Sequence, residues 1–144
     1  MASVGDILRR KGQSIWSTSP ETSVFEALQL MAEKNVGALL IVESQKLVGI
    51  FSERDYARKV ILKGRFSRDT AVREVMTENV ITVEPDRTVD DCMLLMTNRH
   101  IRHLPVLENG QLSGIISIGD VVKAIISDQR FMINQLEDYI TGKR

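Results

Sequence analysis

The sequence contains only one cysteine, Cys92, among its 144 residues. A single cysteine cannot form a disulfide within the chain, and it does not provide the paired thiols that structural zinc sites generally use. The formal net charge is zero, because nineteen Lys and Arg balance nineteen Asp and Glu. A balanced chain has no overall field that attracts nucleic acid or anionic lipid. We therefore expect no disulfide framework, no metal requirement, and neither a nucleic-acid nor a membrane partner.

Long apolar runs are absent as well. No segment has the length and apolar content of a membrane span, and the first ten residues carry Asp6, Arg9 and Arg10 where a signal peptide would be apolar. These absences predict a cytoplasmic protein. The chain does contain 43% hydrophobic residues, which suffices for one compact domain or for two closely packed half-sized units.

An internal repeat runs through the chain without a gap. Half of the chain would bury too little surface to be stable alone, so we expect the two copies to pack about a pseudo-twofold axis, with a ligand cleft between them. The offset is 65 residues, and it aligns Pro20 with Pro85, Val24 with Val89, Leu47 with Leu112, Gly49 with Gly114, Ile50 with Ile115, Ser52 with Ser117 and Asp55 with Asp120.

Hydrophobic periodicity predicts the order β-α-β-β-α in each copy. Apolar residues at i, i+3, i+4 and i+7 predict a first helix from Val24 and from Val89. Each start has the spacing of a capping box, in Ser23 with Glu26 and in Thr88 with Asp91. Short β-prone stretches are expected at 15–18 and 80–83, hairpins at 38–43 with 47–52 and at 104–107 with 112–117, and second helices at 54–62 and 119–126.

The predicted fold class is therefore α+β (mixed α/β), built from two related repeats. We place the first repeat with its N-terminal segment at residues 1–66, the second at 67–128, and a helical tail at 129–144. The tail has apolar residues at helical spacing and no counterpart in the first copy, so it either covers the core or serves a second subunit. These residues are Met132, Ile133, Leu136, Tyr139 and Ile140.

A Ser-x-x-Asp segment stands where a predicted strand passes into a helix in each copy, as Ser52 with Asp55 and Ser117 with Asp120. Backbone N–H groups and the positive end of the helix dipole point outward at such a junction. The aspartate could accept both hydrogen bonds of a ribose diol. The same spacing also fits a capping box that serves only the helix, so the spacing alone leaves both interpretations open.

The chain resembles the cystathionine β-synthase (CBS) domain family, in the form of the stand-alone tandem pair called a Bateman module. The resemblance covers nearly the whole chain. Its carriers are the Gly-x-x-Ser-x-x-Asp segments 49–55 and 114–120, the Arg-His-Leu-Pro-Val segment 102–106 and the Val-x-x-x-Met-Thr segment 72–77.

The resemblance implies a sensor, usually dimeric, that binds AMP, ADP, ATP, S-adenosylmethionine or NAD and catalyses no reaction. In related pairs the aspartate of one repeat shares a ligand with the Arg/His segment of the other, which would join Asp55 with Arg102. Arg102 could hold phosphate bidentately, with His103 as a weaker, pH-dependent donor; otherwise the two are a solvated arginine and a histidine at the core edge. The predicted binding residues are Ser52, Arg54, Asp55, Arg102, His103, Thr18, Ser117, Asp120, Thr82 and Thr77.

Positive charge is unequal between the two copies. Because a phosphate needs charge-assisted donors, we expect AMP to prefer the site built on Asp55 over the site built on Asp120. Arg58 and Lys59 could equally well be solvated residues on an exposed helix face, with no role in ligand binding. The aligned residues are Arg54 with Gly119, Arg58 with Lys123, and Lys59 with Ala124.

Three other classes of function compete with the sensor. An enzyme needs a catalytic constellation, and no such set of residues stands out. A metal site from His100, His103 and Cys92 would use a cysteine that lies on the buried helix stripe. Nucleic-acid binding lacks a basic surplus. The main alternative is a protein-interaction or regulatory scaffold whose ligand clefts are vestigial, and the regulated partner is unknown in either case.

Overall fold

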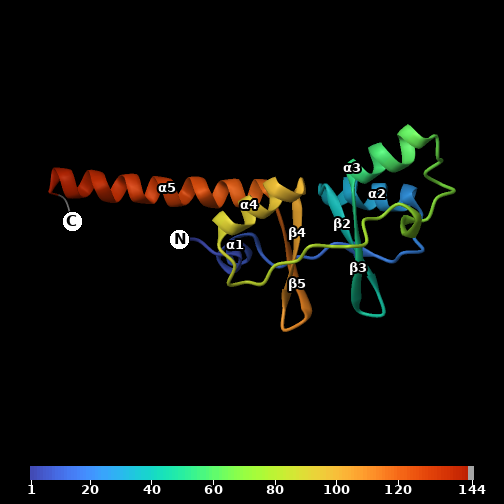
Figure 1. The fold of residues 1–144 in the computed structure, drawn as a ribbon, viewed down its shortest axis with the longest axis horizontal. Coiled ribbons are helices and arrows are strands. Elements are labelled where there is room, and N and C mark those ends of the chain that lie inside the picture. The colour runs from blue at the N-terminus through green and yellow to red at the C-terminus, as the bar shows by residue number, and fades with distance from the viewer. Residues whose placement is uncertain (143–144) are drawn as a thin grey trace. The chain divides into compact units, whose positions relative to one another are not determined.

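The computed structural model describes residues 1–142 and separates into two compact units (Figure 1). The first-repeat unit contains Ser14–Ile81, and the second-repeat unit contains Met1–Gln13 together with the chain from Thr82 onward. Helices and strands are mixed in both, which confirms the predicted α+β class. The units divide the chain differently from the predicted repeat limits of 1–66, 67–128 and 129–144. Those limits stay a prediction, because a compact unit need not coincide with one sequence repeat.

The first-repeat unit is built on a three-stranded sheet of order β1-β2-β3. Strand β1 runs parallel to β2, and β2 pairs antiparallel with β3 in a hairpin. The expected second helix is present but irregular, because an α-helical turn, a wider π-helical turn and a 3₁₀ turn follow one another. The elements are β1 (Ser17–Thr18), α2 (Val24–Lys34), β2 (Ala38–Glu43), β3 (Lys46–Ser52), α3 (Glu53–Asp55), η1 (Tyr56–Val60), η2 (Ile61–Lys63) and η3 (Val72–Glu74).

The second-repeat unit has the antiparallel hairpin β4–β5, and an isolated parallel bridge from Val83 to Val106 stands where the first repeat has β1. Two expectations are corrected here. The predicted helix 119–126 and the predicted tail form one continuous helix, and an unpredicted helix lies near the N-terminus. The elements are α1 (Val4–Lys11), α4 (Val89–Arg99), β4 (His103–Glu108), β5 (Gln111–Ser117) and α5 (Ile118–Thr141).

The predicted helix starts are confirmed. The Ser23 hydroxyl accepts a hydrogen bond from the Glu26 backbone at 3.1 Å, and Thr88 accepts one from the Asp91 backbone at the same distance. Such a side-chain acceptor satisfies one of the backbone donors that a helix start leaves unpaired. The first helix of each repeat thus begins where the sequence places it.

Both hairpins turn through two residues with positive φ. In the second repeat these are Asn109 and Gly110, at 54° and 78°, as the Asn-Gly pair predicts. In the first repeat Ser44 and Gln45 adopt 51° and 66°, although neither residue favours this region. The surrounding strand pairing therefore imposes the turn in the first repeat.

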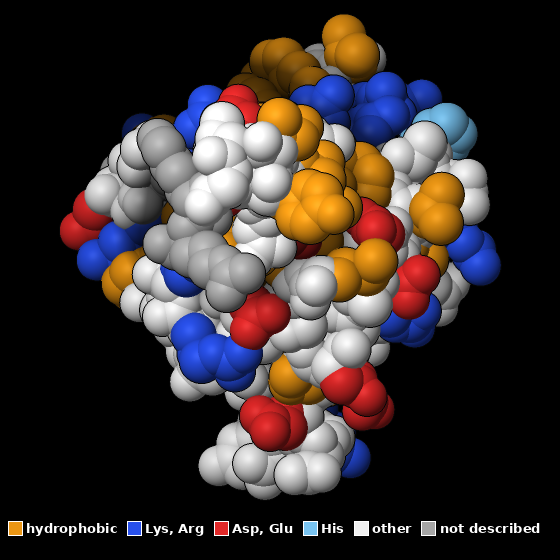
Figure 2. Space-filling view, turned by 90° about the vertical axis from the view of Figure 1, so that its left-hand side faces the viewer, with side chains coloured by type: hydrophobic (Ala, Val, Ile, Leu, Met, Phe, Trp, Pro, Cys, Tyr) orange, Lys and Arg blue, Asp and Glu red, His pale blue; other side chains and the backbone are white. Residues whose placement is uncertain are grey.

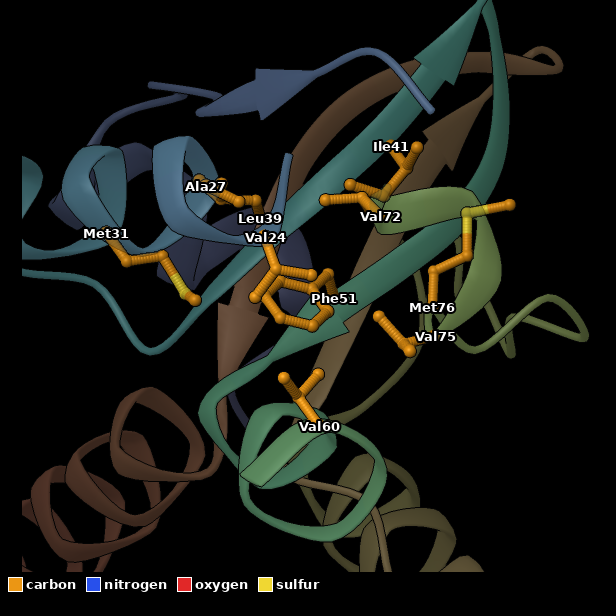
Figure 3. Close-up of a cluster of buried hydrophobic side chains, with 10 residues drawn as sticks. All are labelled: Val24, Ala27, Met31, Leu39, Ile41, Phe51, Val60, Val72, Val75 and Met76. Carbon is orange, nitrogen blue, oxygen red and sulfur yellow. The ribbon is translucent and has the colours of Figure 1, made fainter. Parts of the chain in front are cut away.

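The core of the first-repeat unit lies between α2, the hairpin and the segment after the second helix (Figure 3). Phe51 of β3 stands within this cluster and is fully buried, as are Val24 of α2 and Val60 of η1. The apolar stripe read from the sequence supplies the α2 side of the cluster. Cys92 occupies the matching stripe of α4 and is likewise fully buried, which confirms its place in the core.

Each unit also contains a segment that lies on the far side of the other repeat's boundary in the sequence: helix α1 in the second-repeat unit and the residues around Val72 in the first-repeat unit. In the second-repeat unit α1 packs on β5, and the backbone N–H of Val4 donates to the Arg87 carbonyl at 2.8 Å. In the first-repeat unit the N–H of Val72 donates to the Thr22 carbonyl, also at 2.8 Å. The glycines of the two hairpins permit this close approach, since a Cβ on Gly49 would lie 2.6 Å from the Met76 sulfur.

Replacing Gly49 with alanine should therefore destabilise the protein by about 1–3 kcal/mol, as overpacking of a filled core does. The added Cβ would also stand 3.0 Å from the Thr77 carbonyl oxygen, which is backbone and cannot easily move. At Gly114 the nearest obstacle is the flexible end of Leu8, at 2.8 Å, so Gly114→Ala should cost less. Urea unfolding of both variants measures this order, and equal losses would contradict it.

Candidate functional site

The Ser-x-x-Asp segment of the first repeat forms a reciprocal capping box at the junction of β3 and α3. The Ser52 hydroxyl accepts a hydrogen bond from the Asp55 backbone at 3.2 Å, and Asp55 Oδ2 accepts one from the Ser52 backbone at 3.0 Å. The Ser52 hydroxyl lies 3.1 Å from the same carboxylate oxygen. The helix-capping interpretation of this segment is therefore correct, and any ligand role is added to it.

The second oxygen of Asp55 points to residues outside the box. Thr77 donates to Asp55 Oδ1 at 3.1 Å, and the Lys59 ammonium lies 3.0 Å from it. Asp55 is only 8% exposed, so this carboxylate is desolvated and held by four groups of its own unit. Lys59 is thus not merely part of a solvated helix face. The structure brings together Ser52, Asp55 and Thr77, three of the predicted site residues.

The second repeat reproduces the box at the junction of β5 and α5. The Ser117 hydroxyl accepts from the Asp120 backbone at 3.2 Å, and Asp120 Oδ2 accepts from the Ser117 backbone at 2.8 Å. Among the described residues no hydrogen bond is made to Asp120 Oδ1, and the side chain is more accessible than that of Asp55. The Asp120 carboxylate accordingly has more free acceptor capacity.

Lys11 of α1 is a site residue that the sequence reasoning missed. Its ammonium donates to Asp120 Oδ2 at 2.7 Å and to the Ile115 carbonyl at 3.0 Å. Burial by itself would raise the pKa of Asp120, but the hydrogen bonds from Lys11 and Ser117 and the charge of Lys11 hold it below the ordinary value. Asp120 is therefore ionised at neutral pH.

Each aspartate thus has one lysine beside it, supplied by different parts of the chain. Lys59 reaches Asp55 from four residues along the same helical segment, whereas Lys11 comes from a helix that precedes the first repeat. The repeat alignment could not show the second pair, because it compares Lys59 only with Ala124. The predicted charge difference between the two sites is consequently smaller than the alignment suggests.

His103 belongs to the same part of the second-repeat unit as Asp120, because it faces Ser117 across the β4–β5 pair. Burial lowers the pKa of His103, and the positive charges of Lys11 and Arg102 lower it further against the opposing effect of Asp120. The imidazole is therefore neutral at pH 7. The Arg102 side chain is exposed, and its carbonyl accepts from the Ile118 N–H at 2.8 Å where α5 begins.

The predicted threonines of the first strands lie away from these boxes. Thr18 pairs with Ile41 on β2, three residues along that strand from Ala38, which faces Ser52. Its hydroxyl is within 2.6 Å of the Thr22 hydroxyl. Thr82 lines a hollow of about 310 Å³ with Leu107 and Gly110, at the turn end of the second hairpin. That hollow is at the opposite end of the hairpin from Ser117 and is not the site of the box.

The remaining candidates lie on the surface or in the core. Arg54 and Arg58 are exposed, and Trp16 is 37% exposed with the Lys34 ammonium 4.5 Å from its ring centre. Burial raises the pKa of the Cys92 thiol to about 11, so the thiol is protonated. Within residues 1–142 no cluster of His, Cys, Asp or Glu could hold a metal ion.

No helix in the described part of the chain has the length and apolar character of a membrane span. A CBS domain-containing protein of Arabidopsis thaliana, named CBSX3, mitochondrial, is 42% identical over 149 residues, which cover 96% of this chain and 72% of that protein. The predicted cytoplasmic location thus stays a prediction.

Solved structures share the fold. A protein with CBS domains from Burkholderia ambifaria superposes with a TM-score of 0.85 at 49% identity, over 89% of this chain and 96% of that one. The CBS domain pair of protein MJ0100, in complex with 5′-methylthioadenosine and S-adenosyl-L-methionine, superposes with a TM-score of 0.79 at 28% identity, over 89% of this chain and 98% of that one.

The CBS domain family itself matches residues 4–62 and 72–127, one stretch for each repeat. The two matches span most of the chain, and they coincide with the two copies of the 65-residue internal repeat. This chain belongs to the CBS domain family and contains a tandem pair of CBS domains.

Proposed function

We propose that this chain is a non-enzymatic regulatory module that binds adenosine-containing ligands, with Asp55 and Asp120 as acceptors for the ribose hydroxyls. The observation that carries the proposal is the duplicated arrangement at the strand-to-helix junction. In both repeats a Ser-Asp box fixes a carboxylate at a helix start, and a lysine ammonium lies within 3.0 Å of that carboxylate.

The chemistry of the box suits a nucleoside. An ionised carboxylate is an acceptor only, so it can take hydrogen bonds from two neighbouring hydroxyls. The lysine beside it and the backbone donors of the helix start favour a phosphate or carboxylate of the same ligand. The relative in complex with S-adenosyl-L-methionine and 5′-methylthioadenosine supports an adenosine ligand in general. AMP, ADP, ATP and NAD are the finer candidates from the sequence.

The remaining site residues enter the proposal as predictions. Arg54 and Arg102 are proposed phosphate donors, His103 is a neutral hydrogen-bonding partner at pH 7, and Thr18, Thr77 and Thr82 are proposed polar contacts. Asp55 and Arg102 belong to different compact units, so their sharing of one ligand also stays a prediction. A homodimer, a cytoplasmic location and an unidentified regulated partner complete the proposal.

The alternative is a regulatory scaffold with vestigial clefts. The close hydrogen bonding of Asp55 favours this alternative, because Ser52, Thr77 and Lys59 already bind its carboxylate and a ribose would have to displace or share them. The Asp120 carboxylate favours the sensor, because its Oδ1 accepts no hydrogen bond from the described residues. Ligand binding itself decides between the two.

Calorimetry with AMP, ATP, NAD and S-adenosylmethionine should detect binding of at least one of them. A ligand at 100 times its dissociation constant adds about 2.7 kcal/mol to stability, so the melting temperature should rise as well. Inosine monophosphate is a suitable control, since it has the same ribose phosphate on a different base. If all four adenosine compounds give neither heat nor a thermal shift at millimolar concentration, the scaffold alternative holds.

Asp55→Asn should weaken AMP binding more than Asp120→Asn does, because Arg54, Arg58 and Lys59 follow the first box and only Lys123 follows the second within the same span. Asparagine retains a side-chain oxygen for the capping box, so the helix start is preserved. The loss of a charged acceptor should cost about 1–3 kcal/mol, or roughly fivefold to over a hundredfold in affinity.

Titration calorimetry of the two variants measures this difference, with Asp69→Asn as a control on an exposed carboxylate outside both boxes. Equal losses, or a larger loss for Asp120→Asn, would show that the charge asymmetry does not direct AMP.

Lys11→Met should raise the pKa of Asp120. In the parent chain Lys11 and Ser117 hold that pKa below 3.8 against burial, which acts in the opposite direction. Without the ammonium, only the Ser117 hydrogen bonds oppose the effect of burial, so the pKa should rise from its value in the parent chain. Carbon NMR of the Asp120 carboxyl between pH 2 and 6 follows this directly. Lys123→Met, on the same helix, should leave the pKa unchanged; an unshifted pKa in Lys11→Met would remove Lys11 from the site.

A further inference from the structure

The second half of α5 carries large apolar side chains that its own unit does not cover. The helix begins at the end of β5 and runs away from its hairpin (Figure 1). The tail therefore does not cover the core of its own unit. More than half of each side chain is exposed at Phe131, Met132, Ile133, Leu136, Tyr139 and Ile140.

Most of these residues share one face of the helix. At 3.6 residues per turn, Ile126, Ile133 and Ile140 follow one another at intervals of seven, and Leu136 lies between the last two. Met132 and Tyr139 border this stripe on one side, and Arg130 and Glu137 border it on the other. Phe131 points to the opposite side. Viewed from the side toward which α5 runs, the surface shows exposed hydrophobic side chains beside charged ones (Figure 2).

The stripe has the pattern of a coiled-coil seam, which uses two positions of each heptad. Isoleucine occupies the first seam position in every heptad, and Leu136 is the apolar residue at the second. Gln129 is the polar residue within it. A contiguous apolar face of this kind on a soluble protein marks an interaction surface. The face does not continue the one that packs on the unit, since Val121 and Ala124 are buried while Val122 and Ile126 are exposed.

The charges at the border identify the occupant as another copy of the same helix. Arg130 and Glu137 stand at equivalent heptad positions, just after the second seam position. They are two turns apart, about 10.5 Å along the axis, so they cannot pair within one helix. Neither forms an ion pair within the described residues.

In an antiparallel pair of these helices, Arg130 of each copy would face Glu137 of the other, and Ile133 would pack beside Leu136. Both ion pairs would form at once because of the twofold symmetry. In a parallel pair the same two residues would instead face Met132 and Tyr139, where no charge is complementary. The sequence of this face therefore complements itself in one orientation only.

We propose that residues 126–140 of α5 form an antiparallel two-helix interface with the same segment of a second copy of this chain. The inference concerns the part of α5 that follows the second Ser-Asp box by about one and a half turns, and it includes no residue of either box. It does not depend on the proposed ligand binding, and its test is done without ligand.

Charge reversal with rescue tests the interface on the full chain. Sedimentation of the parent should show self-association in the micromolar range. Arg130→Glu and Glu137→Arg should each weaken it about tenfold, which corresponds to 1.4 kcal/mol, because each variant places like charges together twice. The double variant should restore the parent affinity, and an equimolar mixture of the two single variants should form the heterodimer. A parallel interface or an unrelated one gives neither rescue.

The apolar part is tested by Ile133→Asp, which should abolish association at the parent's working concentration. Phe131→Asp is the matched control, since it introduces the same residue into the same helix on the opposite side and should leave association unchanged. Circular dichroism checks that both variants keep their helix. A parent chain that is monomeric at high micromolar concentration, or single charge variants that associate as tightly as the parent, would overturn the proposal.

Discussion

The hydrogen-bonded pairing of a serine with an aspartate three residues later connects sheet and helix in both repeats. It ends a strand and begins a helix, and it holds one carboxylate oxygen against the backbone N–H of the serine. In the first repeat the other oxygen contacts Thr77 and Lys59, whereas in the second repeat Lys11 contacts the same oxygen as the box. The positions of Thr77 and Lys59 around Asp55, and of Lys11 around Asp120, follow from that fixed carboxylate. One local interaction therefore organises both the fold and the proposed site, which is why spacing alone could not separate the two interpretations.

Most of the architecture was predictable because the chain carries its local signals twice, once in each repeat. Helix stripes, Ser23 and Thr88 as caps, and the Asn109–Gly110 turn are all short-range features that depend on neighbouring residues. Helix α1 also had such a signal, a Ser3–Asp6 capping box, whose two hydrogen bonds are 3.2 and 2.9 Å long. The 65-residue alignment did not indicate this helix, because it gives the helix no partner in the second copy.

The candidate site was predictable only in part, because its long-range pairs leave no local trace. Lys59 lies four residues from Asp55, within the reach of helical periodicity, and could have been paired with it from the sequence. Lys11 and Asp120 are 109 residues apart, and nothing in the spacing of either residue indicates the contact. The length of α5 was also missed, since the sequence was read as two helices although no glycine or proline interrupts it between Val121 and Thr141.

The exchange of segments between the repeats has a consequence for how the chain acquires its structure during synthesis. Helix α1 is synthesised before the first-repeat unit, but Ile115, whose carbonyl Lys11 contacts, lies 104 residues later. At about 5–20 residues per second, that contact waits about 5–20 s. The first-repeat unit, Ser14–Ile81, is continuous in sequence, so all of its residues are synthesised in the meantime. Until residues 82–117 follow, the apolar face of α1 has no partner within its own unit and stays exposed to water.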